Sequence, residues 1–166
     1  MKAAVFHHPD KISFDTVADP IPEKDTYLLL KVTSTAICGS DLHIYDGFFP
    51  QGKDLFMGHE FMGIVEDTGR GMSKFRKGDR IVVPFPIACG QCYFCQHHLP
   101  TACEHSNSEN YGSEGDMLKG KGDPMFGYTA LYGGYSGGQA EYGTKSSLAA
   151  GRVIAIDPLN YRLEKA

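Results

Sequence analysis

Four of the five cysteines in this chain of 166 residues lie within one short stretch, and their spacing suits a metal ion. They are Cys89, Cys92, Cys95 and Cys103, in the pattern C-x2-C-x2-C-x7-C. Tight loops with this spacing can direct four thiolates at one tetrahedral ion, and zinc meets that demand best. We therefore predict a structural zinc site in this segment.

Disulfides, an iron–sulfur cluster and unrelated buried thiols are the alternatives to zinc. Disulfides require an oxidising compartment, but the opening residues MKAAVFHHPD lack the apolar run of a signal peptide, and five cysteines leave one unpaired. Ferredoxins also use C-x2-C-x2-C, but their fourth cysteine follows three residues later and precedes proline. Here Cys103 follows after seven residues and precedes Glu104. Zinc is therefore favoured, with the cluster as the nearest rival.

The fifth cysteine begins a second group of side chains with chemical potential. A short helical turn is expected here, and it carries Cys38, Ser40, Asp41 and His43. Further along the chain, His59 and Glu60 precede an expected strand over residues 60–67. A histidine beside a carboxylate at the start of a strand can join Cys38 on a second metal ion. Histidines at strand ends are commonly structural hydrogen-bonding residues, so the spacing alone leaves both interpretations open.

Short strands and turns must position both groups, because twenty glycines, nine prolines and no tryptophan indicate a strand-rich chain. Strands are predicted over residues 1–6, 12–17, 27–37, 60–67, 81–86 and 137–147. Residues 106–136 are polar and lack a period, and we expect a long surface excursion that covers a site. The run GRVIAID over residues 151–157 is typical of a strand buried in a parallel sheet.

Composition and charge limit the partners of the chain. An apolar content of 42% supports one core plus a small appendage. The net charge of −4 leaves no basic surface for nucleic acid or an anionic membrane. No apolar run approaches the ~18 residues needed to span a bilayer. We expect a soluble, cytoplasmic protein without nucleic-acid or membrane partners.

Four motifs in a fixed order resemble those of the zinc-dependent medium-chain alcohol dehydrogenases. They are Cys38-Gly-Ser-Asp-x-His43, Gly58-His59-Glu60, Gly78-Asp79-Arg80 and the four-cysteine segment. The stretches PFPIACGQCYFC and FGYTALYGGYSGGQAEY are most similar to the glutathione-independent formaldehyde dehydrogenase and dismutase branch. The resemblance implies a mainly β fold over residues 1–147, a GroES-like, partly open β-barrel with a structural-zinc lobe. Residues 148–166 resemble a strand and helix remnant of a Rossmann domain.

The resemblance also implies roles for the second group of side chains. Cys38 and His59 match ligands of a catalytic zinc, and Glu60 matches a neighbour that is an occasional ligand. Asp41 matches the carboxylate that orients the histidine ligand. Ser40 and His43 match a relay that carries the alcohol proton to solvent. The expected walls of a pocket for a small alcohol or aldehyde are Tyr45, Phe48, Phe49 and Phe85.

The region after residue 147 departs from the family pattern. The first strand, the glycine-rich phosphate turn and the usual third zinc ligand are absent from the 166 residues. Asp157 stands at the expected ribose-contacting end of a strand. By itself it would contribute ~1.5–3 kcal/mol, against the ~8 kcal/mol of micromolar binding. We expect zinc but not NAD(P) as a cofactor, and a truncated alcohol or formaldehyde dehydrogenase-like protein that cannot transfer hydride normally.

Two other functions remain open on the sequence. One is a non-enzymatic, zinc-stabilised binding or assembly module. The other is cofactor-free zinc chemistry on carbonyls or esters, with Glu60 or His43 as the base. A β-branched strand over residues 151–157 without its usual neighbour would expose an edge. It should pair with a second copy or dock on the barrel, and we favour a homodimer.

Overall fold

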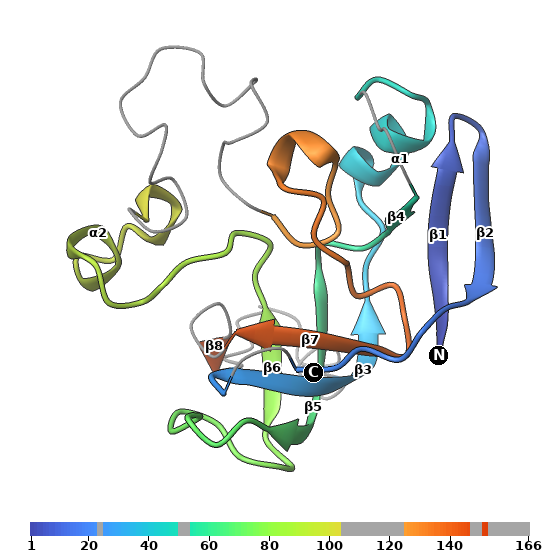
Figure 1. Ribbon diagram of the computed structural model, residues 1–166. Coiled ribbons are helices and arrows are strands. Elements are labelled where there is room, and N and C mark those ends of the chain that lie inside the picture. Colours follow the sequence, from blue (N-terminus) through green and yellow to red (C-terminus); the bar gives the residue numbers. More distant parts are fainter. Residues whose placement is uncertain (23–24, 50–53, 104–124, 147–150, 153–166) are drawn as a thin grey trace, which may run out of the picture.

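The computed structural model describes residues 1–22, 25–49, 54–103, 125–146 and 151–152, which form two antiparallel sheets and a few short helices (Figure 1). The smaller sheet has the strand order β2-β1-β4. Its strands β1 (Lys2–His8) and β2 (Lys11–Thr16) form a hairpin, and β1 also pairs with β4 (Leu55–Phe56). The tight turn of the hairpin includes Asp10, whose φ of 62° is left-handed.

The larger sheet has the strand order β7-β3-β5-β6-β8, with every pair antiparallel. Its strands are β3 (Tyr27–Thr35), β5 (Phe61–Thr68), β6 (Arg80–Val83), β7 (Tyr142–Ser146) and β8 (Gly151–Arg152). The two sheets are not closed into a barrel. This arrangement agrees with the predicted mainly β, partly open architecture.

Two apolar clusters hold the sheets and the first helix in place. In the larger sheet, Leu28 and Leu30 alternate with outward residues and pack with Val65 and Ile81. The second cluster consists of Phe6, Ile44, Leu55 and Met57, from β1, the first helix and the chain around β4. Each such buried side chain contributes about 1.5–3 kcal/mol. The clusters therefore fix the first helix and the start of β5, which carry the second group of predicted site residues.

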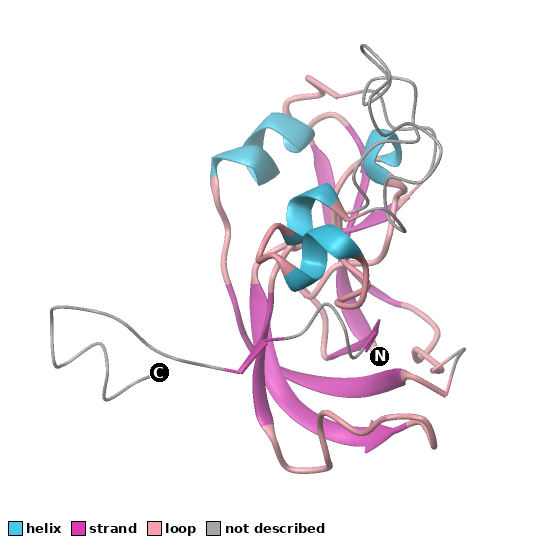
Figure 2. Ribbon diagram, turned by 90° about the vertical axis from the view of Figure 1, so that its left-hand side faces the viewer, coloured by secondary structure: helices cyan, strands magenta, loops and turns pink. Residues whose placement is uncertain are grey.

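The helices are short and gather toward one end of the molecule, whereas the long strands of the larger sheet lie toward the other (Figure 2). They are α1 (Gly39–Tyr45), α2 (Tyr93–Gln96), and the 3₁₀ turns η1 (Pro100–Ala102) and η3 (Ala130–Tyr132). None of the helices in the described part of the chain is long and apolar enough to cross a membrane.

Most described strands follow the sequence prediction, but β4 was not predicted, and β7 begins at Tyr142, five residues after the expected start at residue 137. The strand expected over residues 81–86 ends at Val83, because Pro84 and Pro86 have no N–H to donate to a neighbouring strand. Within residues 106–136, the described part from residue 125 onward returns to the fold and includes η3. Residues 125–136 are therefore part of the fold, and the rest of the expected surface excursion lies outside the described residues.

The expected parallel strand over residues 151–157 is wrong for its described beginning. Gly151 and Arg152 pair antiparallel with Val82 and Ile81 of β6. Gly151 and Arg152 thus dock on the edge of the larger sheet and satisfy backbone groups of β6 within one chain. This is one of the two outcomes expected for an unpaired strand. Residues 153–157, including Asp157, lie outside the described part of the chain.

Candidate metal centres and pocket

The four clustered cysteines converge on one point in a lobe that projects from the larger sheet around α2 (Figure 1). Their four sulfur atoms all lie within 4.8 Å of one another. The Sγ atoms of Cys89 and Cys95 are 3.9 Å apart. Two thiolates on a tetrahedral zinc with 2.3 Å bonds would be about 3.8 Å apart, whereas a disulfide needs about 2.0 Å. All five cysteines are free thiols.

Backbone N–H groups of the lobe point at these sulfur atoms. Cys89 N–H donates to Cys103 Sγ at 3.2 Å, and Cys92 N–H donates to Cys89 Sγ at 3.3 Å. Burial, with a hydrogen bond to Cys92, raises the pKa of the Cys95 thiol to about 12. The Cys95 thiol therefore favours its protonated form unless a cation compensates the charge of the thiolate, while the N–H donors favour thiolate. This donor set fits zinc.

The second group also comes together, although its members are far apart in the sequence. Cys38 Sγ lies 3.1 Å from His59 Nε2, and the Ser40 hydroxyl lies 2.9 Å from that sulfur. Ser40 Oγ is also 3.4 Å from His59 Nε2. A carboxylate oxygen of Glu60 joins Cys38 and His59 so that the three ligand atoms lie within 4.8 Å. His59 is buried, Cys38 is half-buried and Glu60 is exposed.

Local backbone geometry places Cys38 and His59 face to face. Cys38 is the N-cap of α1, where its sulfur accepts the Ser40 N–H and its own N–H donates to Asp41 Oδ2 at 2.9 Å. His59 follows Gly58, whose φ of +100° is left-handed. A Cβ at Gly58 would meet the backbone N of Gln139 at 2.5 Å, so the turn that presents His59 requires glycine.

Asp41 lies on the far side of the His59 ring from Cys38. Its Oδ1 atom is 3.5 Å from His59 Nδ1, and both residues are buried. Neither of these two atoms has a hydrogen-bond partner among the described residues. The carboxylate therefore faces the one ring nitrogen that does not face the sulfur. That arrangement suits a histidine that presents Nε2 to a metal ion.

The structure does not bring His43 into this group. Asp41 and Ile44 form the buried side of α1, whereas His43 is exposed and its ring packs on Phe48 at 5.2 Å. A residue one position before Ile44 points about 100° away from it around a helix. The predicted Ser40–His43 pair is therefore separated, with only Ser40 facing the metal-ligand group.

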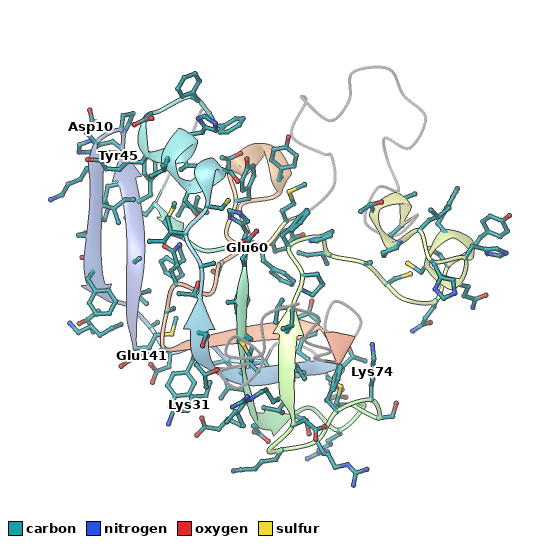
Figure 3. The ribbon with its side chains drawn as sticks, turned by 180° about the vertical axis from the view of Figure 1, so that it is seen from behind. Asp10, Lys31, Tyr45, Glu60, Lys74 and Glu141 are labelled. Atoms are coloured by element: carbon teal, nitrogen blue, oxygen red, sulfur yellow. The ribbon has the colours of Figure 1, made fainter. Side chains whose placement is uncertain are left out.

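A pocket of about 260 Å³ opens beside the second group. Its lining consists of Cys38, Ser40, His59, Glu60, Phe85, Met125, Tyr128 and Tyr132. Figure 3 shows Glu60 near the middle of the molecule, between α1 and the larger sheet. The chemically reactive side chains thus share one concave site with four apolar or aromatic walls, the usual composition of a small-molecule pocket.

Of the four predicted aromatic walls, the described lining includes Phe85 alone. Tyr45 lies beside Asp10 at the end of the β1–β2 hairpin, where its carbonyl accepts the Asp10 N–H (Figure 3). Phe48 is 71% exposed, and Phe49 packs on Tyr128 with ring centroids 5.8 Å apart. Phe48 packs beside His43, and none of these three aromatic residues belongs to the described lining.

Three lining residues were not singled out in the sequence: Met125, Tyr128 and Tyr132. They belong to the segment expected to cover a site, and its density of tyrosine and glycine was the available signal. Burial and the neighbouring Tyr132 raise the pKa of the Tyr128 hydroxyl, and a side-chain hydrogen bond with Ser40 opposes that rise. Tyr128 is thus a neutral hydroxyl at ordinary pH.

Residues 24–150 match the family of alcohol dehydrogenase GroES-like domains. The chain belongs to this family. Among relatives, it is 47% identical over 143 residues to the uncharacterised zinc-type alcohol dehydrogenase-like protein AdhB of Bacillus subtilis, covering 86% of this chain and 35% of that protein. It is 36% identical over 149 residues to the formaldehyde dismutase of Pseudomonas putida, covering 85% and 34%.

Solved structures agree with this assignment to the GroES-like domain family. The alcohol dehydrogenase TADH from Thermus sp. ATN1 superposes with a TM-score of 0.73 at 33% identity, covering 89% of this chain and 38% of that one. The family and its mainly β fold are therefore confirmed. The chain spans about a third of the length of the relatives it matches.

Proposed function

We propose that this GroES-like domain binds two zinc ions, a structural ion in the four-cysteine lobe and a second ion at the mouth of the pocket. The observation that carries the proposal is the convergence of two separate donor sets, each within 4.8 Å. The first set would use Cys89, Cys92, Cys95 and Cys103. The second would use Cys38, His59 and Glu60, which leaves a position open toward the pocket.

The second site is suited to a small alcohol or aldehyde. Zinc bound there supplies Lewis acidity, which lowers the pKa of an alcohol or polarises a carbonyl. The residues of the chain orient the reacting oxygen and its proton. Ser40 Oγ lies within 3.4 Å of both Cys38 Sγ and His59 Nε2, so its hydroxyl can accept a hydrogen bond from the hydroxyl of an alcohol held at the same place. Asp41 keeps the His59 ring in one orientation.

We infer that the 166-residue polypeptide does not bind NAD(P) well enough for turnover by itself. The sequence contains no G-x-G-x-x-G turn, and backbone N–H groups at such a turn supply most of the affinity for the pyrophosphate. Asp157 could contribute only one contact to a ribose. Calorimetric titration with NAD and NADP tests this inference. Micromolar binding accompanied by alcohol oxidation would reject it.

Metal analysis tests the two-zinc proposal directly. We expect two zinc ions per chain in the wild type, one in Cys38→Ser, and one in a variant of the four-cysteine lobe. The Cys38→Ser variant preserves a short polar side chain at the N-cap of α1, so helix capping is kept. A single zinc that is insensitive to Cys38→Ser would contradict the proposal.

A single zinc would favour the second candidate, a zinc-stabilised binding or assembly module. The observation behind this candidate is the difference in ligand sets: the lobe offers four thiols, whereas the pocket offers two ligands at its base and an exposed Glu60. Cofactor-free zinc chemistry on carbonyls or esters is a weaker candidate. Glu60 could act as its base, but His43 faces away from the pocket.

We also propose a reducing, cytoplasmic environment and a homodimer. Thiols that bind zinc must stay reduced, which supports the first. The dimer was expected from an unpaired strand, and the pairing of Gly151 and Arg152 with β6 removes part of that reason. Light scattering of the purified chain measures the oligomeric state, and a monomer at all concentrations would reject the dimer.

A further inference from the structure

Glycines allow two segments that are distant in the sequence, around Gly58 and around Gly127, to approach each other closely. Gly127 has a φ of +60°, and a Cβ there would overlap the carbonyl oxygen of Gly58. Gly137 lies against both segments, with its Cα 2.8 Å from the same imaginary Cβ. Only residues without side chains allow such close backbone approach. His59 follows Gly58 and Tyr128 follows Gly127, so the close approach of these two glycines sets His59 and Tyr128 side by side.

Tyr128 contacts the second metal-ligand group through both its ring and its hydroxyl. Its ring meets the His59 imidazole edge-on, with centroids 5.5 Å apart and an interplanar angle of 89°. Tyr132 packs on the other side of Tyr128 at 5.1 Å. An interaction with the Ser40 side chain lowers the pKa of the Tyr128 hydroxyl, against the rise caused by burial, and both residues line the pocket. The tyrosine thus touches two of the groups that would handle the reacting oxygen.

We propose that Tyr128 is a positioning residue of this site: its ring fixes the His59 imidazole, and its hydroxyl directs the Ser40 hydroxyl toward the oxygen of a small neutral ligand. This inference rests on the proposed function of the pocket. His43 faces solvent, and the Ser40 hydroxyl contacts the ligand side of the site, at Cys38 Sγ and His59 Nε2. Tyr128 is the pocket residue placed to direct the Ser40 hydroxyl.

The charge of the pocket lining determines which small molecule is suitable for testing the role of Tyr128. The described lining includes the carboxylate of Glu60 and no lysine or arginine, so an anion should be disfavoured and a neutral alcohol accepted. Trifluoroethanol is a small neutral primary alcohol whose binding is followed by ¹⁹F NMR without any turnover. Trifluoroacetate serves as the matched anionic probe.

The experiment titrates the zinc-loaded chain with trifluoroethanol and measures zinc content in parallel. Tyr128→Phe keeps the ring and removes the hydroxyl, so we expect two zinc ions and an affinity for trifluoroethanol reduced about two- to tenfold, the range of one hydrogen bond. Tyr128→Ala also removes the ring and should weaken the second zinc. The control Tyr135→Phe changes a 48% exposed residue outside the lining and should leave both measurements unchanged.

The outcomes separate this inference from the function on which it rests. Two zinc ions with unchanged trifluoroethanol affinity in Tyr128→Phe would overturn the role of Tyr128 and leave the proposed function standing. A wild-type chain with one zinc and no trifluoroethanol binding would overturn both. If Tyr128→Ala fails to fold, Tyr128→Phe still decides, because the phenyl ring preserves the packing on His59 and Tyr132.

Discussion

The two metal-ligand groups of this domain are built in opposite ways. The four-cysteine lobe takes all its donors from residues 89–103, on α2, η1 and the loops around them. The pocket group joins Cys38 and His59, which are 21 residues apart, and adds Tyr128 from a still later segment. Short-range chain geometry suffices for the lobe. The pocket group exists only after the sheets have formed.

This difference predicts where each ion would act energetically. The lobe has a small apolar cluster of Ala88, Cys92 and Cys103 and few other buried residues among those described, so its folding would depend on a bound ion. The elements that carry the pocket group are held in place by the two large apolar clusters, which include Leu28 and Phe6. Losing its ion should cost function and little stability.

The largest expected effect comes from breaking the lobe. Cys92→Ser removes a buried ligand, and structural zinc sites in small domains are worth about 10–16 kcal/mol of apparent binding energy. We expect loss of one zinc and local unfolding of residues 89–103, measured by metal analysis and hydrogen exchange. Cys38→Ser is the control, with the lobe intact. Equal protection of the lobe in both variants would remove the contrast between the two sites.

Acid should also release zinc from the lobe, because its proposed ligands are thiolates that protons compete for. Zinc must displace the protons of its thiols, and burial raises the Cys95 pKa to about 12, so the protonated form competes at every lower pH. Zinc affinity should therefore fall as pH falls, by about tenfold per unit for each displaced proton. In the metal-free chain the raised pKa of Cys95 acts in the opposite direction: its contribution to stability is fully present below about pH 9 and is lost as the pH rises toward about 12. Competition with a chromophoric chelator between pH 6 and 8 checks the slope; a flat profile would contradict it.

Gly58→Ala tests the turn that presents His59 to the pocket group. The alanine would be strained at a φ of +100° and would collide with the backbone of Gln139, so we expect a loss of about 3 kcal/mol. Gly78→Ala is a matched control, because Gly78 also has a left-handed φ, +95°, but its Cβ would meet nothing within 4 Å. That variant should lose about 1 kcal/mol. Denaturant unfolding measures both, and equal losses would show that close packing at Gly58 is unimportant.

Asp41→Asn tests the orientation of His59 without removing a ligand. The amide keeps an oxygen that can accept the Cys38 N–H but loses the charge that faces His59 Nδ1. Changing such a partner typically weakens metal binding 10–100-fold. Only the second zinc should be affected, as measured by chelator competition. Asp46→Asn, at the other end of α1, is the control. Retained affinity in Asp41→Asn would leave the aspartate with a capping role alone.

The smallest effect is expected at His43. It is exposed and packs on Phe48 outside the pocket, so His43→Ala should change the free energy of unfolding by less than about 0.5 kcal/mol. Both zinc ions and the affinity for trifluoroethanol should also be unchanged. A loss of the second zinc in this variant would mean that His43 turns into the site in solution.

The strands were readable in advance because their cause is local. Residues 27–35 are rich in apolar and β-branched side chains, which predicts a strand by composition, and the structure forms β3 there with Leu28 and Leu30 in the core. The end of β6 was misjudged by three residues because the prolines at 84 and 86 were given less weight than the apolar run. The pairing partner of residues 151–152 depends on which sheet edge is free, and no local pattern contains that information.

The amino-acid sequence by itself determined the four-cysteine lobe and the order of the strands, since both follow from spacing within a few residues. The tertiary structure decided that His59 meets Cys38, that His43 faces away, and that Tyr128 rather than Phe48 lines the pocket. These outcomes depend on the direction in which each side chain leaves its element and on backbone contacts between Gly58 and Gly127. Long-range packing sets both, so neighbouring residue types could not reveal them.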